Sequence, residues 1–193
     1  GLGKTLQIIS VILAHKEKGE QGCALVVCPA SLVYNWVEEI VRFAPGLKAV
    51  AVTGNKAARK KILKEYETFD FLVTSYDLLK RDIDIYDGMQ LGWQIIDEAQ
   101  FIKNAKSAAA KSVKLIHASR RFALTGTPIE NRLSELWSIF DFLMPGFLYQ
   151  YERFRKEYEI PISKDKDPRR TEALKNLIAP FILRRKNGAI RFL

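Results

Sequence analysis

Cysteine is scarce in this chain, and long hydrophobic runs are missing. The only two cysteines, Cys23 and Cys28, flank one expected strand. An extended strand of this length separates their Cα atoms by about 16 Å. A disulfide needs Cα atoms within about 7 Å, so a local bridge is excluded. Two free thiols fit a reducing, intracellular compartment, either the cytoplasm or nucleoid of a prokaryote or the nucleus of a eukaryote.

No apolar run is long enough to cross a bilayer, so we expect no membrane partner. Internal repeats, low-complexity segments and a signal peptide are also missing. Because the chain opens inside a motif, we expect a fragment of a longer protein, and the missing signal peptide excludes little.

Acidic residues are outnumbered, with 22 Asp and Glu against 31 Lys and Arg and a net charge of +9. This excess indicates a polyanionic partner, or merely a soluble surface. The most basic stretch is a helix expected at 55–66. We interpret that helix, together with Arg169 and Arg170, as solvated surface.

The expected elements alternate along most of the chain. Strands are expected at 24–28, 50–53, 71–74, 92–97 and 121–125, and helices at 4–16, 31–43, 55–66, 76–80 and 105–117. Such alternation predicts an α/β fold, with a mostly parallel sheet flanked by helices. Beyond Phe142 an aromatic, helical pattern predicts an appendage, with a charged loop at 161–168. We interpret Trp137, at helical spacing with Leu133 and Phe140, as a packing residue.

The first five residues, Gly1-Leu2-Gly3-Lys4-Thr5, match the second half of the phosphate-binding loop G-x-x-x-x-G-K-[ST]. Glycine lets the backbone turn tightly and point N–H groups at an anion. The lysine supplies positive charge for phosphates, and the threonine supplies a hydroxyl for Mg²⁺. Taken alone, this half-motif fits an ordinary glycine-rich turn before a helix equally well.

A second nucleotide motif is the apolar run 92–96, which ends in Asp97 and Glu98. The run predicts a buried parallel strand, and open α/β sheets bind ligands at the carboxyl ends of their strands. An isolated acidic pair would more simply be a solvated turn. Combined with the first motif, it predicts an ATP and Mg²⁺ site in which Asp97 holds the metal shell and Glu98 deprotonates water.

Hydroxyl residues follow the other expected strands, at Ser31, Thr74, Ser75, Thr125 and Thr127. Hydroxyls and free amides at helix N-termini suit phosphate oxygens. Each is also explained by capping, with Ser31 and Ser75 as N-caps and residues 127–130 as a capping box. Their common place on the nucleotide edge favours a function.

The ordered motifs resemble the Swi/Snf family, double-stranded-DNA-translocating ATPases of helicase superfamily two. The motifs are 1–7 (GLGKTLQ), 28–36 (CPASLVYNW), 74–77 (TSYD), 97–100 (DEAQ), 102–104 (IKN), 124–131 (LTGTPIEN), 133–137 (LSELW) and 183–185 (LRR). They cover nearly the whole chain in family-like order and spacing. The resemblance implies a RecA-like ATP-binding lobe at 1–143, a helical protrusion at 144–180, and a return segment toward a second lobe at 181–193.

The resemblance also implies roles for individual residues. The catalytic residues would be Lys4, Asp97, Glu98 and Gln100, with Gln100 sensing the γ-phosphate. ATP would be bound by Gly1, Gly3, Lys4 and Thr5, and Mg²⁺ by Thr5 and Asp97. The backbone of duplex DNA would be contacted by Pro29, Ser31, Thr74, Ser75, Lys103 and Asn104. Coupling of ATP state to DNA grip would involve Thr125, Gly126 and Thr127.

The implied function is remodelling of protein–DNA complexes, including chromatin, by ATP-driven translocation on duplex DNA. The start of the phosphate-binding loop and the second lobe with its arginine fingers lie outside these residues, so the fragment is expected to be catalytically incompetent. An arginine finger contributes on the order of 10³–10⁵ in rate. Two alternatives are an RNA or restriction-type helicase lobe and a non-catalytic module that binds nucleic acid or a partner. Intact Lys4, Thr5, Asp97 and Glu98 argue against the second alternative.

Overall fold

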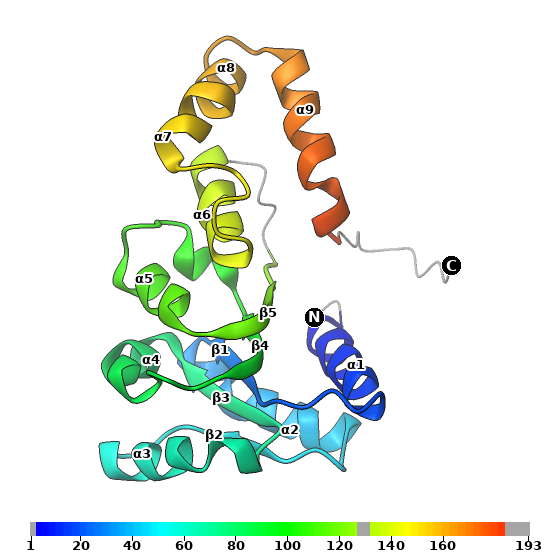
Figure 1. The fold of residues 1–193 in the computed structure, drawn as a ribbon, viewed down its shortest axis with the longest axis vertical. Coiled ribbons are helices and arrows are strands. Elements are labelled where there is room, and N and C mark those ends of the chain that lie inside the picture. The colour runs from blue at the N-terminus through cyan, green and yellow to red at the C-terminus, as the bar shows by residue number, and fades with distance from the viewer. Residues whose placement is uncertain (1–2, 127–131, 184–193) are drawn as a thin grey trace.

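The computed structural model describes residues 3–126 and 132–183. Its centre is a parallel sheet of order β2-β3-β1-β4-β5 (Figure 1). The strands are β1 (Ala24–Cys28), β2 (Ala49–Ala51), β3 (Phe71–Ser75), β4 (Leu91–Ile96) and β5 (Ala118–Ala123). All strands are parallel, so their carboxyl ends meet at one edge, where ligands bind in open α/β sheets. The predicted fold class is confirmed.

Helices cover both faces of this sheet, because side chains alternate between the faces along each strand. On one face, Val26 and Phe71 pack against α1 (Lys4–Glu17) and α2 (Val33–Phe43). On the other, Leu25 and Leu72 pack against α3 (Lys56–Lys64), α4 (Tyr76–Asp82) and α5 (Ala108–Leu115). The central strands β1, β3 and β4 are buried throughout, as their largely apolar sequence predicts.

The sequence expectation that Ser31 caps α2 is wrong. A 3₁₀ turn at Ala30–Leu32 precedes the helix, whose N-cap is Leu32, so the exposed Ser31 does not cap it. Phe43, at the end of this helix, is 42% exposed. The guanidinium of Arg42 lies 5.4 Å from its ring and partly covers it. The last turn of α2 therefore packs on the core through Ile40, while Phe43 lies on its outer side.

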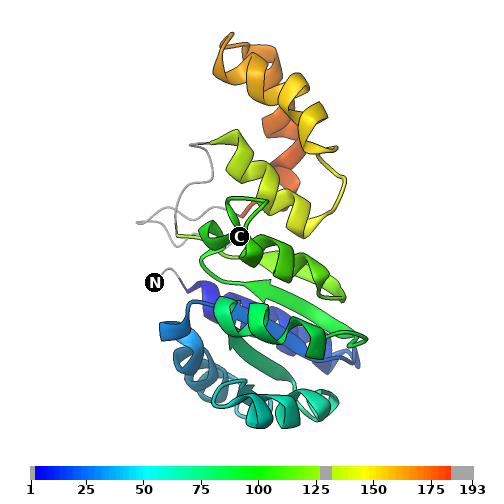
Figure 2. The ribbon, with the colours of Figure 1, turned by 90° about the vertical axis from the view of Figure 1, so that its left-hand side faces the viewer.

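Helix α6 (Leu133–Leu143) leads into the appendage, which consists of α7 (Tyr151–Phe154), a π-helical turn (Arg155–Glu159), α8 (Ile160–Ser163) and α9 (Pro168–Ile178). Figure 2 shows these helices extending away from the sheet. The charged loop expected at 161–168 is therefore shorter, because Pro161 lies in the first turn of α8, where its missing N–H is tolerated. The prediction of a helical appendage is otherwise confirmed.

Helix α6 contributes to two hydrophobic cores. Leu136, Trp137 and Phe140 pack with the appendage helices, while Ile139 and Phe142 pack with the core beneath the sheet. The indole of Trp137 is 8% exposed and donates a hydrogen bond to the Tyr149 carbonyl. The interpretation of Trp137 as a packing residue is confirmed.

The structure also bears on the two cysteines and on the expectation of no membrane-crossing segment. Cys23 and Cys28 are both buried and free, so the absence of a local disulfide is confirmed. Among residues 3–126 and 132–183, no helix is both long and apolar enough to cross a membrane.

Candidate nucleotide and nucleic-acid site

The described phosphate-loop residues, Gly3, Lys4 and Thr5, lie at the carboxyl edge of the sheet, at the start of α1 (Figure 1). Gly3 takes a left-handed conformation, with φ of 70°, immediately before Lys4 begins the helix. A Cβ atom placed on Gly126 would lie 3.6 Å from the Lys4 Nζ atom. The fold thus brings Lys4 of the first motif beside the segment after β5, although 122 positions separate them in sequence.

Asp97 follows β4 directly, and its carboxylate is buried and held on both oxygens. The backbone N–H of Glu98 donates to Oδ1 over 2.9 Å, and the indole Nε1–H of Trp36 donates to Oδ2 over 3.0 Å. The Tyr76 hydroxyl donates to the Asp97 carbonyl over 2.8 Å. Three donors from three segments therefore fix this residue.

Glu98 begins a chain of side-chain hydrogen bonds that leads to β5. Its backbone is left-handed, with φ of 52°, which is uncommon for a residue with a Cβ atom and is often found at functional sites. The Gln100 Nε2 atom donates to the Glu98 carboxylate over 2.7 Å, and the Thr125 hydroxyl donates to the Gln100 Oε1 atom over 3.2 Å. Gln100 thus joins Glu98 to the segment that faces Lys4.

The residues present fit ATP and Mg²⁺. Mg²⁺ is usually bound through one or two carboxylates together with waters and phosphate oxygens, and Asp97 with Thr5 offers hard oxygen donors of this kind. The lack of a side chain at Gly126 keeps the space beside the Lys4 ammonium open. When bound, the metal would supply electrostatic stabilisation of phosphate charge.

Four of the six predicted DNA contacts lie at the surface. The side chains of Ser31, Lys103 and Asn104 are exposed, and Pro29 is half-buried. The Asn104 carboxamide oxygen accepts from the Lys106 backbone N–H, which orders the turn after the second motif. Their contact with DNA stays a prediction.

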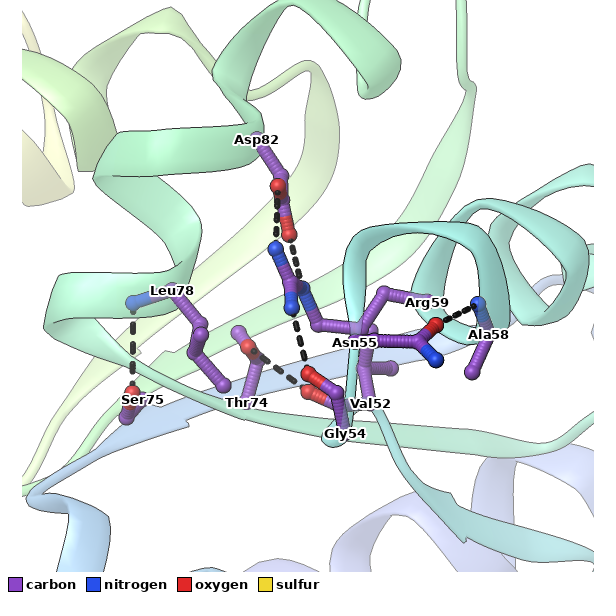
Figure 3. A network of polar contacts seen from close by, with 9 residues as sticks. All are labelled: Val52, Gly54, Asn55, Ala58, Arg59, Thr74, Ser75, Leu78 and Asp82. Atoms are coloured by element: carbon purple, nitrogen blue, oxygen red, sulfur yellow. Dashed lines mark hydrogen bonds and ion pairs between the residues drawn. The ribbon is translucent and has the colours of Figure 1, made fainter.

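The expected rim position of Thr74 and Ser75 is corrected, because both side chains are buried at 0% and 3% exposure. The Thr74 hydroxyl points to the Val52 carbonyl at 3.5 Å, and the Ser75 hydroxyl caps α4 by accepting from the Leu78 N–H (Figure 3). The capping alternative for Ser75 is thereby confirmed. These two hydroxyls support the strand end from inside the fold.

Arg59 corrects the interpretation of the 55–66 helix as solvated surface. It is 6% exposed and forms a two-pronged ion pair with Asp82 of α4, with N–O distances of 2.5 and 2.8 Å. A third bond reaches the Gly54 carbonyl (Figure 3). Asp82 holds the pKa of the Arg59 guanidinium above its usual range. The other basic residues of α3, Lys56, Lys60, Lys61 and Lys64, are exposed as predicted.

Sequence reasoning missed two residues of the site, Trp36 and Tyr76. The helical spacing of Trp36 predicted only burial, and nothing in the sequence indicated a bond to a residue 61 positions away. Burial, with the nearby Asp97 charge, raises the pKa of the Tyr76 hydroxyl, which therefore remains a donor. Burial likewise raises the pKa of the Cys28 thiol to about 12, so this neighbour stays protonated. Gly1, Thr127, the proposed capping box at 127–130, and Arg184 and Arg185 lie outside the described residues.

The chain resembles proteins of known family. A family model described as the SNF2-related domain matches residues 1–191. The ATPase core of Sulfolobus solfataricus SWI2/SNF2, solved in complex with double-stranded DNA, is 43% identical and has a TM-score of 0.87 over 96% of this chain. The chain spans 38% of that structure.

Two curated relatives are also similar. YwqA of Bacillus subtilis, described as a candidate ATP-dependent helicase or translocase, is 40% identical over 96% of this chain, which spans 20% of YwqA. The TATA-binding protein-associated factor MOT1 of Saccharomyces cerevisiae is 37% identical over 96% of this chain, which spans 11% of MOT1. Because the family model and these relatives each match almost the whole length of this chain, the chain belongs to the SNF2-related family of ATPase domains in helicase superfamily two.

Proposed function

We propose that this domain binds ATP with Mg²⁺ and couples ATP hydrolysis to translocation on double-stranded DNA. The observation that carries the proposal is the hydrogen-bond chain from Glu98 through Gln100 to Thr125. That chain joins the proposed general base to a segment lying beside the phosphate-loop Lys4. A change in the bound nucleotide can therefore shift the segment after β5 through these hydrogen bonds.

Each residue of the site has its own proposed role in ATP binding and hydrolysis. Lys4 binds phosphate oxygens, and Asp97 and Thr5 orient the metal. Glu98 accepts the proton of the attacking water, and its hydrogen bond from Gln100 fixes the carboxylate for that task. Thr125 and Gly126 take the coupling role, because Thr125 bonds Gln100 and the adjacent Gly126 lies beside Lys4.

The partner we propose is the sugar–phosphate backbone of duplex DNA, contacted at Pro29, Ser31, Lys103 and Asn104. The archaeal relative was solved with double-stranded DNA, and the yeast relative is named for association with the TATA-binding protein. We extend the proposal to remodelling of DNA-bound protein complexes in an intracellular compartment. A second lobe would supply the arginine fingers, so the isolated lobe should turn over ATP poorly.

The test is Lys4→Ala in the full-length protein, with Lys18→Ala at the exposed end of the same helix as the control. Lys4→Ala should abolish duplex-stimulated ATP hydrolysis and leave duplex binding largely in place, since Lys4 contacts only nucleotide in this proposal. Lys18→Ala should change neither. Near wild-type hydrolysis in Lys4→Ala would refute the phosphate-loop assignment. Stimulation by RNA in place of duplex DNA would instead favour an RNA helicase.

A further inference from the structure

The buried Asp97 is held by aromatic side chains from two segments, and one of these segments directly follows the predicted DNA contacts Pro29 and Ser31. Trp36 lies in α2, directly after the Ala30–Leu32 turn that carries Ser31. Tyr76 begins α4, directly after the end of β3. The nucleotide and nucleic-acid edges of the domain therefore meet at one carboxylate.

These contacts are shielded from water. Trp36 is 1% exposed and Tyr76 is 5% exposed. The Tyr76 ring is also stacked on Phe101, with centroids 4.9 Å apart and planes 4° apart. Hydrogen bonds in such low-dielectric surroundings are stronger than at the surface, and a bond to a charged acceptor is stronger still.

Each bond on Asp97 constrains a different part of the residue. Tyr76 holds the backbone carbonyl, and the Glu98 N–H holds Oδ1. The Oδ2 atom depends on the Trp36 indole. Rotation of the carboxylate is thus set by the position of a side chain on α2. That helix is continuous from Val33 to Phe43, so a shift of its first turn carries the indole with it.

We propose that Trp36 is the positioning residue through which DNA engagement at Pro29 and Ser31 reaches Asp97. Phosphate contact at the 3₁₀ turn biases the first turn of α2, and the indole N–H then sets the orientation of the metal-binding carboxylate. This inference rests on the proposed function. It adds a second route between DNA and nucleotide, distinct from the chain through Gln100 and Thr125.

The chain provides its own controls, because each of its three tryptophans has a different hydrogen-bond state. The indole N–H of Trp93 is buried without a hydrogen-bond partner among the described residues. That of Trp137 donates to the Tyr149 carbonyl over 3.1 Å, in the appendage core. Replacing each by Phe makes the same chemical change, but only Trp36→Phe frees Oδ2 of Asp97.

The first experiment measures ATP turnover of the full-length protein with and without saturating duplex DNA. Trp36→Phe should lower the ratio of stimulated to basal turnover by about tenfold, within the ~5–150-fold range usual for coupling between sites. Duplex affinity should change little. Trp93→Phe and Trp137→Phe should keep the wild-type ratio. A ratio equal to wild type in Trp36→Phe, or an equal loss in all three variants, would overturn the proposal.

The second experiment observes the wild-type sequence directly and does not depend on ATP hydrolysis. The full-length protein is labelled with 5-fluorotryptophan, and the ¹⁹F resonances that disappear in Trp36→Phe and Trp93→Phe identify the two residues. Duplex DNA without nucleotide should shift the Trp36 resonance and leave that of Trp93 in place. A bound duplex that does not move the Trp36 resonance contradicts the inference. Failure of duplex DNA to stimulate wild-type turnover would instead contradict the proposed function.

Discussion

Two regions share the carboxyl edge of the sheet, and their polar groups are arranged in opposite ways. Around Asp97 and Glu98, side chains from four segments are tied to one another by hydrogen bonds. On the neighbouring rim, the exposed Ser31, Lys103 and Asn104 lie at the surface. The first region is an interlocked network, and the second is an open surface.

This difference teaches what to expect of substitutions. Groups that act as a unit lose most of their effect when any one is removed, so single changes are large and not additive. Independent surface contacts contribute separately, and each loss is small. Substitutions at Glu98, in the buried Arg59 ion pair and at Lys103 should accordingly have effects that decrease in this order.

Glu98→Gln tests the network. The change keeps the size of the side chain and its place beside Asp97, but it removes the basicity needed to deprotonate water. Turnover of the full-length protein should fall by roughly 10²–10⁴, the usual contribution of a general base, while ATP still binds. The matched control is Glu38→Gln on the exposed face of α2, which should hydrolyse ATP normally. Normal turnover in Glu98→Gln would refute the role given to this carboxylate.

Arg59 and Lys60 provide the comparison within one helix. Arg59→Ala should lower the free energy of unfolding by about 3 kcal/mol, because it leaves the 2%-exposed Asp82 buried without its partner. Lys60→Ala, on the exposed side of α3, should stay within about 0.5 kcal/mol of wild type. Urea unfolding of both variants measures the difference. Equal stabilities would show that the buried ion pair contributes nothing net.

Lys103→Ala tests the open rim and should have the smallest effect. Binding should weaken to a similar extent on unrelated duplexes, and the log–log salt slope should decrease by about one, because one phosphate contact and its released counterion are lost. Lys61→Ala on α3 is the control and should leave the slope unchanged. An unchanged slope in Lys103→Ala, or a loss confined to one sequence, would mean that this rim is not the DNA track.

The sheet was predictable from sequence because each strand is marked by the residues of its own short segment. Apolar runs such as 24–28 and 71–74 are punctuated by polar and turn residues, and burial on both faces requires continuous hydrophobicity. The position of Asp97 and Glu98 at a strand end followed from the same pattern. Boundaries shifted where the signal was weak, as at β5, which begins at Ala118 and not at 121.

The remaining parts depend on contacts between distant residues. In the sequence, Arg59 cannot be distinguished from the other basic residues of its helix. Only the fold brings Asp82 of α4 into contact with it. Thr74 lies near the end of a strand, where the sequence suggests an exposed hydroxyl. In the fold, the neighbouring β2 segment covers this hydroxyl. The bond from Trp36 to Asp97 likewise joins residues whose sequence patterns indicate only a core helix and a strand end.

The shared helix α6 has a mechanical consequence. Its Ser138 hydroxyl donates to the Ile102 carbonyl over 2.6 Å, immediately before Lys103, while its opposite face is embedded in the appendage. Because α6 packs into the appendage on one side and bonds to this segment on the other, a torque on the appendage can pass through the helix to the turn that follows the second motif. A load on α6 is therefore felt 36 positions earlier in sequence, at the Ile102 carbonyl beside the proposed DNA contact Lys103.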